Sequence, residues 1–179
     1  MKQYQKNQPI KKHKYCSQSL AQEYFSNTFF SLTLYWKNDL IFYIDLETSG
    51  KASYPAVTFS TYSSVVQEAL NQYQRKQAPH WPDPPLNWSE VSSFQQRVYT
   101  TLLKNVPWGQ TISYGQLAKL CNIPGGARAV GRSMAANPWP VIVPCHRVLS
   151  TDGRLGGFSS GLKLKQTLLK LEGLNQKQP

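Results

Sequence analysis

The stretch PVIVPCHRV, residues 140–148, places an apolar segment directly before two reactive side chains. Residues 141–143 are β-branched and apolar, which is typical of a buried strand or core segment. Pro144 ends this run because proline has no backbone N–H to donate, so Cys145 and His146 lie where the chain leaves the core. A neighbouring imidazole favours the nucleophilic thiolate of a cysteine. An isolated cysteine often only fills space in a core, so the pair alone leaves both interpretations open.

The composition limits the class of protein. A chain of 179 residues can form one domain or two small ones. No apolar run has the length of a membrane span, and the polar, basic residues 1–20 do not resemble a secretory signal. The three cysteines, Cys16, Cys121 and Cys145, form no close pairs. This pattern argues against a disulfide framework and predicts a cytoplasmic protein, or a nuclear one in a eukaryote.

The positive charge is concentrated in the second half of the chain. The net charge is +11; residues 1–90 carry 9 Lys and Arg against 7 Asp and Glu, whereas residues 91–179 carry 11 against 2. A strongly basic region favours a polyanionic partner, most often nucleic acid. A basic surface that only keeps the protein in solution is the alternative. Residues 1–20 hold five lysines and no acid, and we expect them to form a flexible tail that attracts phosphates.

The first half of the chain predicts a small supporting α/β domain, residues 21–88. Apolar residues alternate in 28–36 and recur in 40–46, with a turn between them, which predicts a hairpin. Residues 57–59 suggest a third strand, and residues 64–75 have the spacing of a helix with one apolar face.

This half also contains a proline-rich segment and a few residues of the types that bind metals. The proline-rich residues 79–85 cannot be helical and predict a connector between domains. His13, Cys16 and His80 only faintly resemble metal ligands. A zinc site requires four ligands at a recognisable spacing, so we expect no metal.

The pattern becomes helical from residue 89 to the end. Ser93 and Gln96 have the spacing of a capping box, which predicts a helix beginning there. Ser113 and Gln116 form a second candidate box at the start of a short helix. Residues 126–136 predict another helix, and two short helices joined by a turn are typical of a helix-turn-helix.

The second of these helices is unusual. It is rich in Gly and Ala, and it carries Arg128 and Arg132 one turn apart. Small side chains let a helix approach another backbone, and arginines bind phosphates. An ordinary core helix with two solvated arginines fits the same residues. Farther on, a glycine-serine loop at residues 155–161 precedes a last helix, residues 162–172, which Gly173 ends.

Together these segments resemble the O6-alkylguanine-DNA alkyltransferases, also called methylated-DNA–protein-cysteine methyltransferases. The resemblance covers roughly residues 90–173. The residues that carry it are Pro144-Cys145-His146-Arg147-Val148 after Asn137-Pro138 and Pro140, Ser113-Tyr114 with Gln116-Leu117-Ala118, Ala127-Arg128-Ala129-Val130-Gly131, Gly156-Gly157 with Ser159, and Glu172-Gly173 after a Leu-rich helix.

The resemblance implies a fold and an activity. The fold is a ribonuclease-H-like α/β domain followed by a mainly α, winged-helix-like domain, residues 89–179, with a helix-turn-helix. The activity is DNA repair by direct reversal: the protein transfers a methyl or small alkyl group from O6-alkylguanine in double-stranded DNA to Cys145. O4-alkylthymine is left open as a second substrate. The transfer is irreversible, with one turnover per molecule, and the protein acts as a monomer without a cofactor.

The resemblance also assigns roles to residues. Cys145 is the nucleophile, His146 its base through a water, and Glu172 orients the imidazole, which is the logic of a catalytic triad. The remaining assignments are a brace for the reactive turn (Asn137), a proton donor that also helps to expel the nucleotide (Tyr114), a side chain that fills the space left by the base (Arg128), further DNA contacts (Ser113, Tyr114, Ala127, Ala129) and a substrate pocket (Met134, Pro140, Val148, Phe158, Ser159).

The chemistry agrees with extrusion of the base. The alkyl carbon lies inside the duplex, and a sulfur cannot reach it in line unless the nucleotide swings out, at a cost of a few kcal/mol. A helix of small residues suits the minor groove, where a wedge side chain offsets the lost stacking. Two residues depart from the family pattern: Phe158 replaces a common Tyr, and Arg132 replaces a small residue.

Two other functions fit part of the pattern. A DNA-binding protein without activity, either a regulator or a relative that only recognises lesions, explains the basic half and the paired helices. A cysteine hydrolase explains Cys145, His146 and Glu172 but leaves the basic half and the paired helices unexplained.

Overall fold

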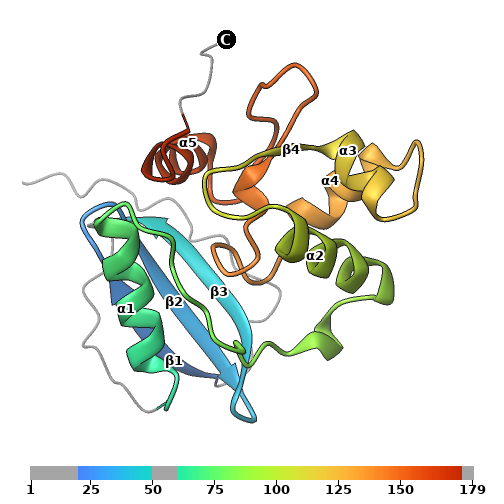
Figure 1. The fold of residues 1–179 in the computed structure, drawn as a ribbon. Coiled ribbons are helices and arrows are strands. Elements are labelled where there is room, and N and C mark those ends of the chain that lie inside the picture. The colour runs from blue at the N-terminus through green and yellow to red at the C-terminus, as the bar shows by residue number, and fades with distance from the viewer. Residues whose placement is uncertain (1–19, 50–59, 175–179) are drawn as a thin grey trace, which may run out of the picture.

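A computed structural model of the chain describes residues 20–49 and 60–174. The third strand expected at residues 57–59, the expected tail up to residue 19, and the side chains of His13 and Cys16 lie outside these ranges. The expected order, a small sheet with one helix followed by a mainly helical half, is confirmed (Figure 1).

The first half is a three-stranded antiparallel sheet covered by one helix. Strands β1 (Ala21–Ser26), β2 (Phe30–Lys37) and β3 (Leu40–Thr48) pair in that order, and helix α1 (Ser63–Gln74) lies along one face of the sheet (Figure 1). Strands β2 and β3 form the predicted hairpin. Asn38 and Asp39 connect them with φ of 52° and 59°, the left-handed conformation that tight hairpin turns require.

Strand β1 was not predicted because its sequence hides the alternation. Glu23 points inward and is 1% exposed, where an apolar residue would be expected. Its carboxylate accepts hydrogen bonds from the hydroxyl of Ser63 and, at 3.2 Å, from the backbone N–H of Ser60. A buried acid thus ties the edge of the sheet to the beginning of α1.

The second half consists of short helices joined by turns. Two short strands, β4 (Ile112–Ser113) and β5 (Val148–Leu149), pair in parallel and bring the start of helix α3 (Tyr114–Leu120) beside the segment after Cys145. The elements are a 3₁₀ turn at Trp88–Glu90, α2 (Ser93–Asn105), β4 (Ile112–Ser113), α3 (Tyr114–Leu120), α4 (Ala127–Ala135), a 3₁₀ turn at Cys145–Arg147, β5 (Val148–Leu149) and α5 (Leu162–Leu171).

The two halves are joined through strand β3. The indole N–H of Trp139 donates to Ile41 O at 2.9 Å, and Ile44 N–H donates to Pro138 O at 2.8 Å. Trp139 is fully buried. Residues 140–144 connect this anchor to the 3₁₀ turn at Cys145–Arg147, the reactive turn, so the sheet fixes one end of the segment that leads to Cys145.

Residues 141–143 form a buried core segment and not a strand. All three side chains are at most 3% exposed, but Val141 has φ of +76°, a conformation that is rare for a β-branched residue. Val143 N–H donates to Trp139 O at 2.9 Å. The chain therefore folds into a tight turn here, and its apolar side chains are buried without pairing in a sheet.

The capping box of α2 lies one residue earlier than predicted. Both Ser92–Gln95 and Ser93–Gln96 have the required spacing, and the structure uses the first pair. Ser92 Oγ accepts from Gln95 N–H at 3.3 Å, and Gln95 Oε1 accepts from Ser92 N–H at 3.0 Å. The box at Ser113 and Gln116 is present as predicted.

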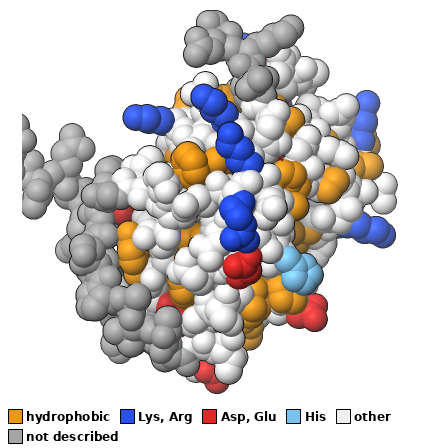
Figure 2. All heavy atoms as spheres, turned by 60° about the vertical axis from the view of Figure 1, so that its left-hand side comes forward, with side chains coloured by type: hydrophobic (Ala, Val, Ile, Leu, Met, Phe, Trp, Pro, Cys, Tyr) orange, Lys and Arg blue, Asp and Glu red, His pale blue; other side chains and the backbone are white. Residues whose placement is uncertain are grey.

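Within the described ranges, no helix has both the length and the apolar character needed to cross a membrane. On the face shown in Figure 2, Lys and Arg side chains stand in a broken line across the surface.

The two serines provide a matched test of the helix start. We expect Ser92→Ala to lower the free energy of unfolding by about 1 kcal/mol, since the first turn loses its side-chain acceptor. Ser93→Ala keeps the cap and improves helix propensity, so it should leave stability unchanged or slightly higher. Urea unfolding of both variants measures the difference, and equal effects would contradict the observed cap.

Candidate active site

Cys145 begins a buried 3₁₀ turn and is 3% exposed. The side-chain amide of Asn137 donates to its sulfur at 3.2 Å and to Val143 O at 2.9 Å. The Asn137 carbonyl oxygen accepts from Trp139 N–H at 3.0 Å. The Asn137 side chain therefore braces residues 139–143 before this turn and contacts the thiol directly.

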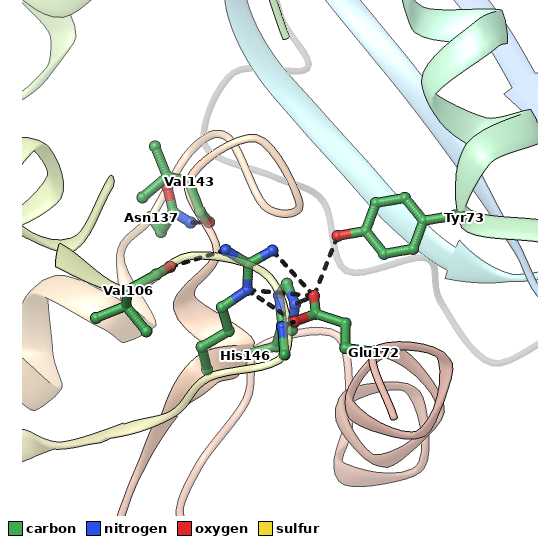
Figure 3. A network of polar contacts seen from close by, with 8 residues as sticks. Tyr73, Val106, Asn137, Val143, His146 and Glu172 are labelled. Atoms are coloured by element: carbon green, nitrogen blue, oxygen red, sulfur yellow. Dashed lines mark hydrogen bonds and ion pairs between the residues drawn. The ribbon is translucent and has the colours of Figure 1, made fainter. Parts of the chain in front are cut away.

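His146 and Glu172 form a buried pair beside this turn. His146 Nε2 lies 2.7 Å from Glu172 Oε1 (Figure 3), and neither side chain is exposed. A carboxylate accepts hydrogen bonds, so we assign the proton of the neutral imidazole to Nε2. Among the described residues, the buried Nδ1 of His146 has no hydrogen-bond partner. A neutral His146 thus keeps a free lone pair on Nδ1.

Arg147 completes the surroundings of Glu172, a role that the sequence did not reveal. Its Nε lies 2.9 Å from Glu172 Oε2, and its Nη2 lies 3.1 Å from Oε1. The guanidinium also donates to Val106 O at 2.9 Å. The backbone N–H of Gly109 donates to Glu172 Oε2 at 3.2 Å. Besides His146, the carboxylate therefore receives hydrogen bonds from Arg147 in the same turn and from Gly109 in the turn after α2.

These contacts set the protonation states. Burial of the Glu172 carboxyl opposes its ionisation, but the hydrogen bond from His146 and the charge of Arg147 outweigh burial and lower its pKa. For His146, burial together with the charges of Arg147 and Lys165 lowers the pKa despite the adjacent carboxylate. The pair is therefore a carboxylate and a neutral imidazole at neutral pH, and Arg147 carries the balancing charge.

The thiol itself is protonated at rest. Burial raises the pKa of Cys145, while the hydrogen bond from Asn137 and the charge of Lys165 act in the opposite direction. A base that removes its proton is therefore needed before the sulfur can act as a nucleophile.

Lys165 is a second buried cation that sequence reasoning missed. Its ammonium donates to Val148 O at 2.7 Å and to Leu155 O, and it lies 6.0 Å from the centre of the Phe158 ring. Burial lowers its pKa to about 8, opposed by Cys145. The available signal was helical spacing, because Lys165 lies one turn before Leu168 and Leu169 on the buried face of α5.

Tyr114 lies between α4 and the glycine-serine loop. A Cβ added at Gly156 would come within 2.9 Å of the Tyr114 hydroxyl, and one added at Gly131 would lie 3.9 Å from its ring. Burial raises the pKa of Tyr114, and Cys145 contributes to this effect. The phenol is therefore protonated and electrostatically coupled to the sulfur.

The other residues singled out in the sequence are less closely grouped. Arg128 is exposed on α4, with Ala127 and Ala129 partly exposed beside it. Ser113 caps α3 through a 3.1 Å bond from Gln116 N–H. Three pocket candidates are buried (Met134, Pro140, Val148), Phe158 is partly buried and Ser159 is exposed.

Two further observations concern the surface and metals. A shallow groove separates the start of α2 from α4, lined in part by Ser92, Gln95 and Arg132. In the part of the chain that the structure describes, no three His, Cys, Asp or Glu side chains come together in a way that could hold a metal ion.

Known proteins resemble this chain in both sequence and fold. The family model described as the 6-O-methylguanine DNA methyltransferase, DNA binding domain, matches residues 93–174. A crystal structure of Mycobacterium tuberculosis OGT in complex with DNA is similar to this structure, with a TM-score of 0.68 and 32% sequence identity over 85% of this chain and 92% of that one. The chain belongs to the O6-methylguanine-DNA methyltransferase family.

Other members of the family extend the comparison. The O6-methylguanine-DNA methyltransferase of Pyrococcus kodakaraensis has a TM-score of 0.67 and 28% identity, over 87% of this chain and 99% of that one. The methylated-DNA–protein-cysteine methyltransferases of Thermococcus kodakarensis and Homo sapiens are 46% and 44% identical over 91 and 108 residues. These matches cover 51% and 58% of this chain, and 51% and 52% of the two relatives. The chain thus spans about half the length of these curated relatives.

The ion pair of Arg147 with Glu172 has a natural control on the surface. Arg147→Met leaves a buried carboxylate without its cation, and we expect it to lower the free energy of unfolding by about 3–5 kcal/mol. Arg154→Met removes an ion pair with Asp152 of 2.6 Å, in which the Arg154 side chain is 73% exposed. We expect little change there, because solvent screens exposed pairs. Denaturant unfolding compares the two, and equal losses would contradict the buried network.

Proposed function

We propose that the protein is a methylated-DNA–protein-cysteine methyltransferase that repairs O6-alkylguanine in double-stranded DNA. The observation that carries the proposal is the contact set around Cys145: a thiol held by Asn137, next to an imidazole whose Nε2 is bound to Glu172 and whose Nδ1 is free among the described residues. The family model covers this site, and the M. tuberculosis relative is found in complex with DNA.

In this proposal Cys145 displaces guanine from the alkyl carbon. His146 takes the thiol proton through a water at Nδ1, and Glu172 stabilises the resulting imidazolium and its orientation, while Arg147 holds the Glu172 carboxylate in place. A bond forms between the sulfur and the alkyl carbon as the bond between that carbon and O6 breaks. The electron pair of the broken bond remains on the guanine, and Tyr114 donates a proton toward the ring.

The product is a thioether, and none of the described side chains near it offers a route to reverse the bond. Each molecule therefore acts once, and the reaction consumes no cofactor. The buried Lys165 also bears on this chemistry, because a cation near the sulfur stabilises the thiolate in the moment before transfer.

The DNA contacts that we propose lie on α3 and α4 and at the residue before α3. We infer that the small residues of α4, Ala127 and Ala129, approach the minor groove with Ser113 and Tyr114, and that exposed Arg128 occupies the space left by the extruded nucleotide. Met134, Pro140, Val148, Phe158 and Ser159 form the pocket for the base in this proposal.

We assign residues 21–88 to a ribonuclease-H-like supporting domain and residues 89–179 to a winged-helix-like catalytic domain, acting as a monomer. O4-alkylthymine is a second substrate to be assayed beside O6-alkylguanine.

Cys145→Ala tests the nucleophile. We expect this variant to lose methyl transfer from O6-methylguanine duplex DNA completely while it binds DNA with little change, because the substitution removes only the sulfur. The matched control is Cys121→Ala, which removes the other buried thiol of the described residues and should retain transfer. Transfer of labelled methyl groups and DNA affinity are measured side by side. Repair by Cys145→Ala would overturn the proposal.

Arg128→Ala tests extrusion. The Arg128 side chain compensates for lost stacking only when a base leaves the duplex. We therefore expect the variant to slow transfer from duplex DNA by roughly tenfold or more, while transfer from the free modified base is unchanged. Lys104→Ala, an exposed cation at the end of α2, is the control for general charge loss. Single-turnover rates on both substrates give the comparison, and equal losses on duplex and free base would contradict the role of Arg128.

A further inference from the structure

One contact to Glu172 comes from the other half of the chain. The phenol of Tyr73, near the end of α1, donates to Glu172 Oε1 at 3.4 Å across a separation of 99 residues (Figure 3). Tyr73 is fully buried. The structure thus brings a polar group from the sheet-covering helix directly onto the carboxylate that orients His146.

The packing around the Tyr73 ring fixes the position of this phenol. Its ring meets Phe30 of β2 edge to face, with centroids 5.4 Å apart, and meets Trp108 with centroids 4.9 Å apart. Trp108 precedes Gly109, whose N–H binds the other oxygen of the same carboxylate. Two supports of Glu172 are therefore held by one aromatic cluster, which is anchored on the N-terminal sheet.

Tyr73 and His146 share a single oxygen atom. Both donate to Oε1 of Glu172, at 3.4 and 2.7 Å. Among the described residues, the other charged groups that act on His146 are Arg147 from the same turn and Lys165 from α5, and Lys165 also acts on the thiol of Cys145. Tyr73 is the contribution of α1 to this set.

We propose that Tyr73 is a positioning residue for the transfer reaction. Through Tyr73, the N-terminal sheet and α1 set the strength of the hydrogen bond between His146 and Glu172. The inference rests on the proposed function, in which His146 is the base. By donating a hydrogen bond, the phenol reduces the negative charge on Oε1, and this weakens the hydrogen bond that the same oxygen accepts from the imidazole. Burial and the neighbouring Glu172 raise the pKa of Tyr73, which keeps the phenol protonated, and therefore a donor, at neutral pH.

Because Tyr73 and His146 share Oε1, loss of the phenol changes the pKa of His146 in a definite direction. Without the phenol, Oε1 carries more charge and stabilises the imidazolium of His146 more strongly, which raises the pKa of His146. A base with a higher pKa is lost to protonation at a higher pH. The acid limb of the transfer rate should therefore move toward neutral pH when the phenol is removed.

Tyr73→Phe removes only the hydroxyl and keeps the aromatic packing. The matched control is Tyr99→Phe, since the Tyr99 phenol is also fully buried and donates to Ser133 O at 2.8 Å, not to Glu172. Two readouts are compared in the full chain: the NMR resonance of the His146 Nε2 proton in DNA-free protein, and the pH dependence of single-turnover transfer. Thermal unfolding is measured in parallel for both variants.

We expect Tyr73→Phe to shift the Nε2 proton resonance downfield, because its hydrogen bond to Glu172 strengthens, and to raise the midpoint of the acid limb by roughly half to one pH unit. Tyr99→Phe should move neither. If Tyr73→Phe lowers thermal stability but moves the resonance and the midpoint no more than the control does, Tyr73 is only structural and the inference is overturned. Absence of transfer in the unaltered protein would instead defeat the proposed function, and the resonance would still decide the role of Tyr73.

Discussion

The buried carboxylate of Glu172 is the constraint on which the site depends. An ionised carboxyl removed from water costs several kcal/mol unless donors and a countercharge surround it. Here Arg147, His146, Gly109 and Tyr73 all donate to it. These four donors come from the reactive turn, the turn after α2 and helix α1. The requirement to satisfy one charge thus holds together the segments that form the site, and it fixes the imidazole beside the thiol in a single orientation.

Burial raises the pKa of Cys145 and lowers the pKa of His146, the two groups that exchange a proton in the proposed reaction. It holds Cys145 as a thiol and His146 as a neutral base, so the resting site avoids an unpaired thiolate in a protected environment. Asn137 and Lys165 lower the cost of the thiolate when it forms. A neutral site of this kind becomes nucleophilic only when the thiol proton is removed, which is compatible with the single turnover that we propose.

The sequence predicted those parts that depend on local pattern. The hairpin, helix α1 and the short helices α3 and α4 follow from the spacing of their apolar residues, and Cys145 with His146 stood out by adjacency alone. Strand β1 was missed because Glu23 faces inward, and the cap of α2 was misplaced because Ser92 and Ser93 both fit the motif. Tyr73, Gly109, Arg147 and Lys165 could not be assigned, since their partners lie 10 to 99 residues away and only tertiary packing brings them together.

The central claim is that one sulfur accepts the alkyl group. The most direct measurement is a peptide map by mass spectrometry after incubation of the full chain with duplex DNA carrying a single O6-methylguanine. We expect the peptide that contains Cys145 to gain the mass of one methyl group in place of a hydrogen, in proportion to the lesions lost, and the peptide that contains Cys121 to remain unchanged. An unmodified Cys145 peptide, or lesion loss with the methyl group on another residue, would contradict the account.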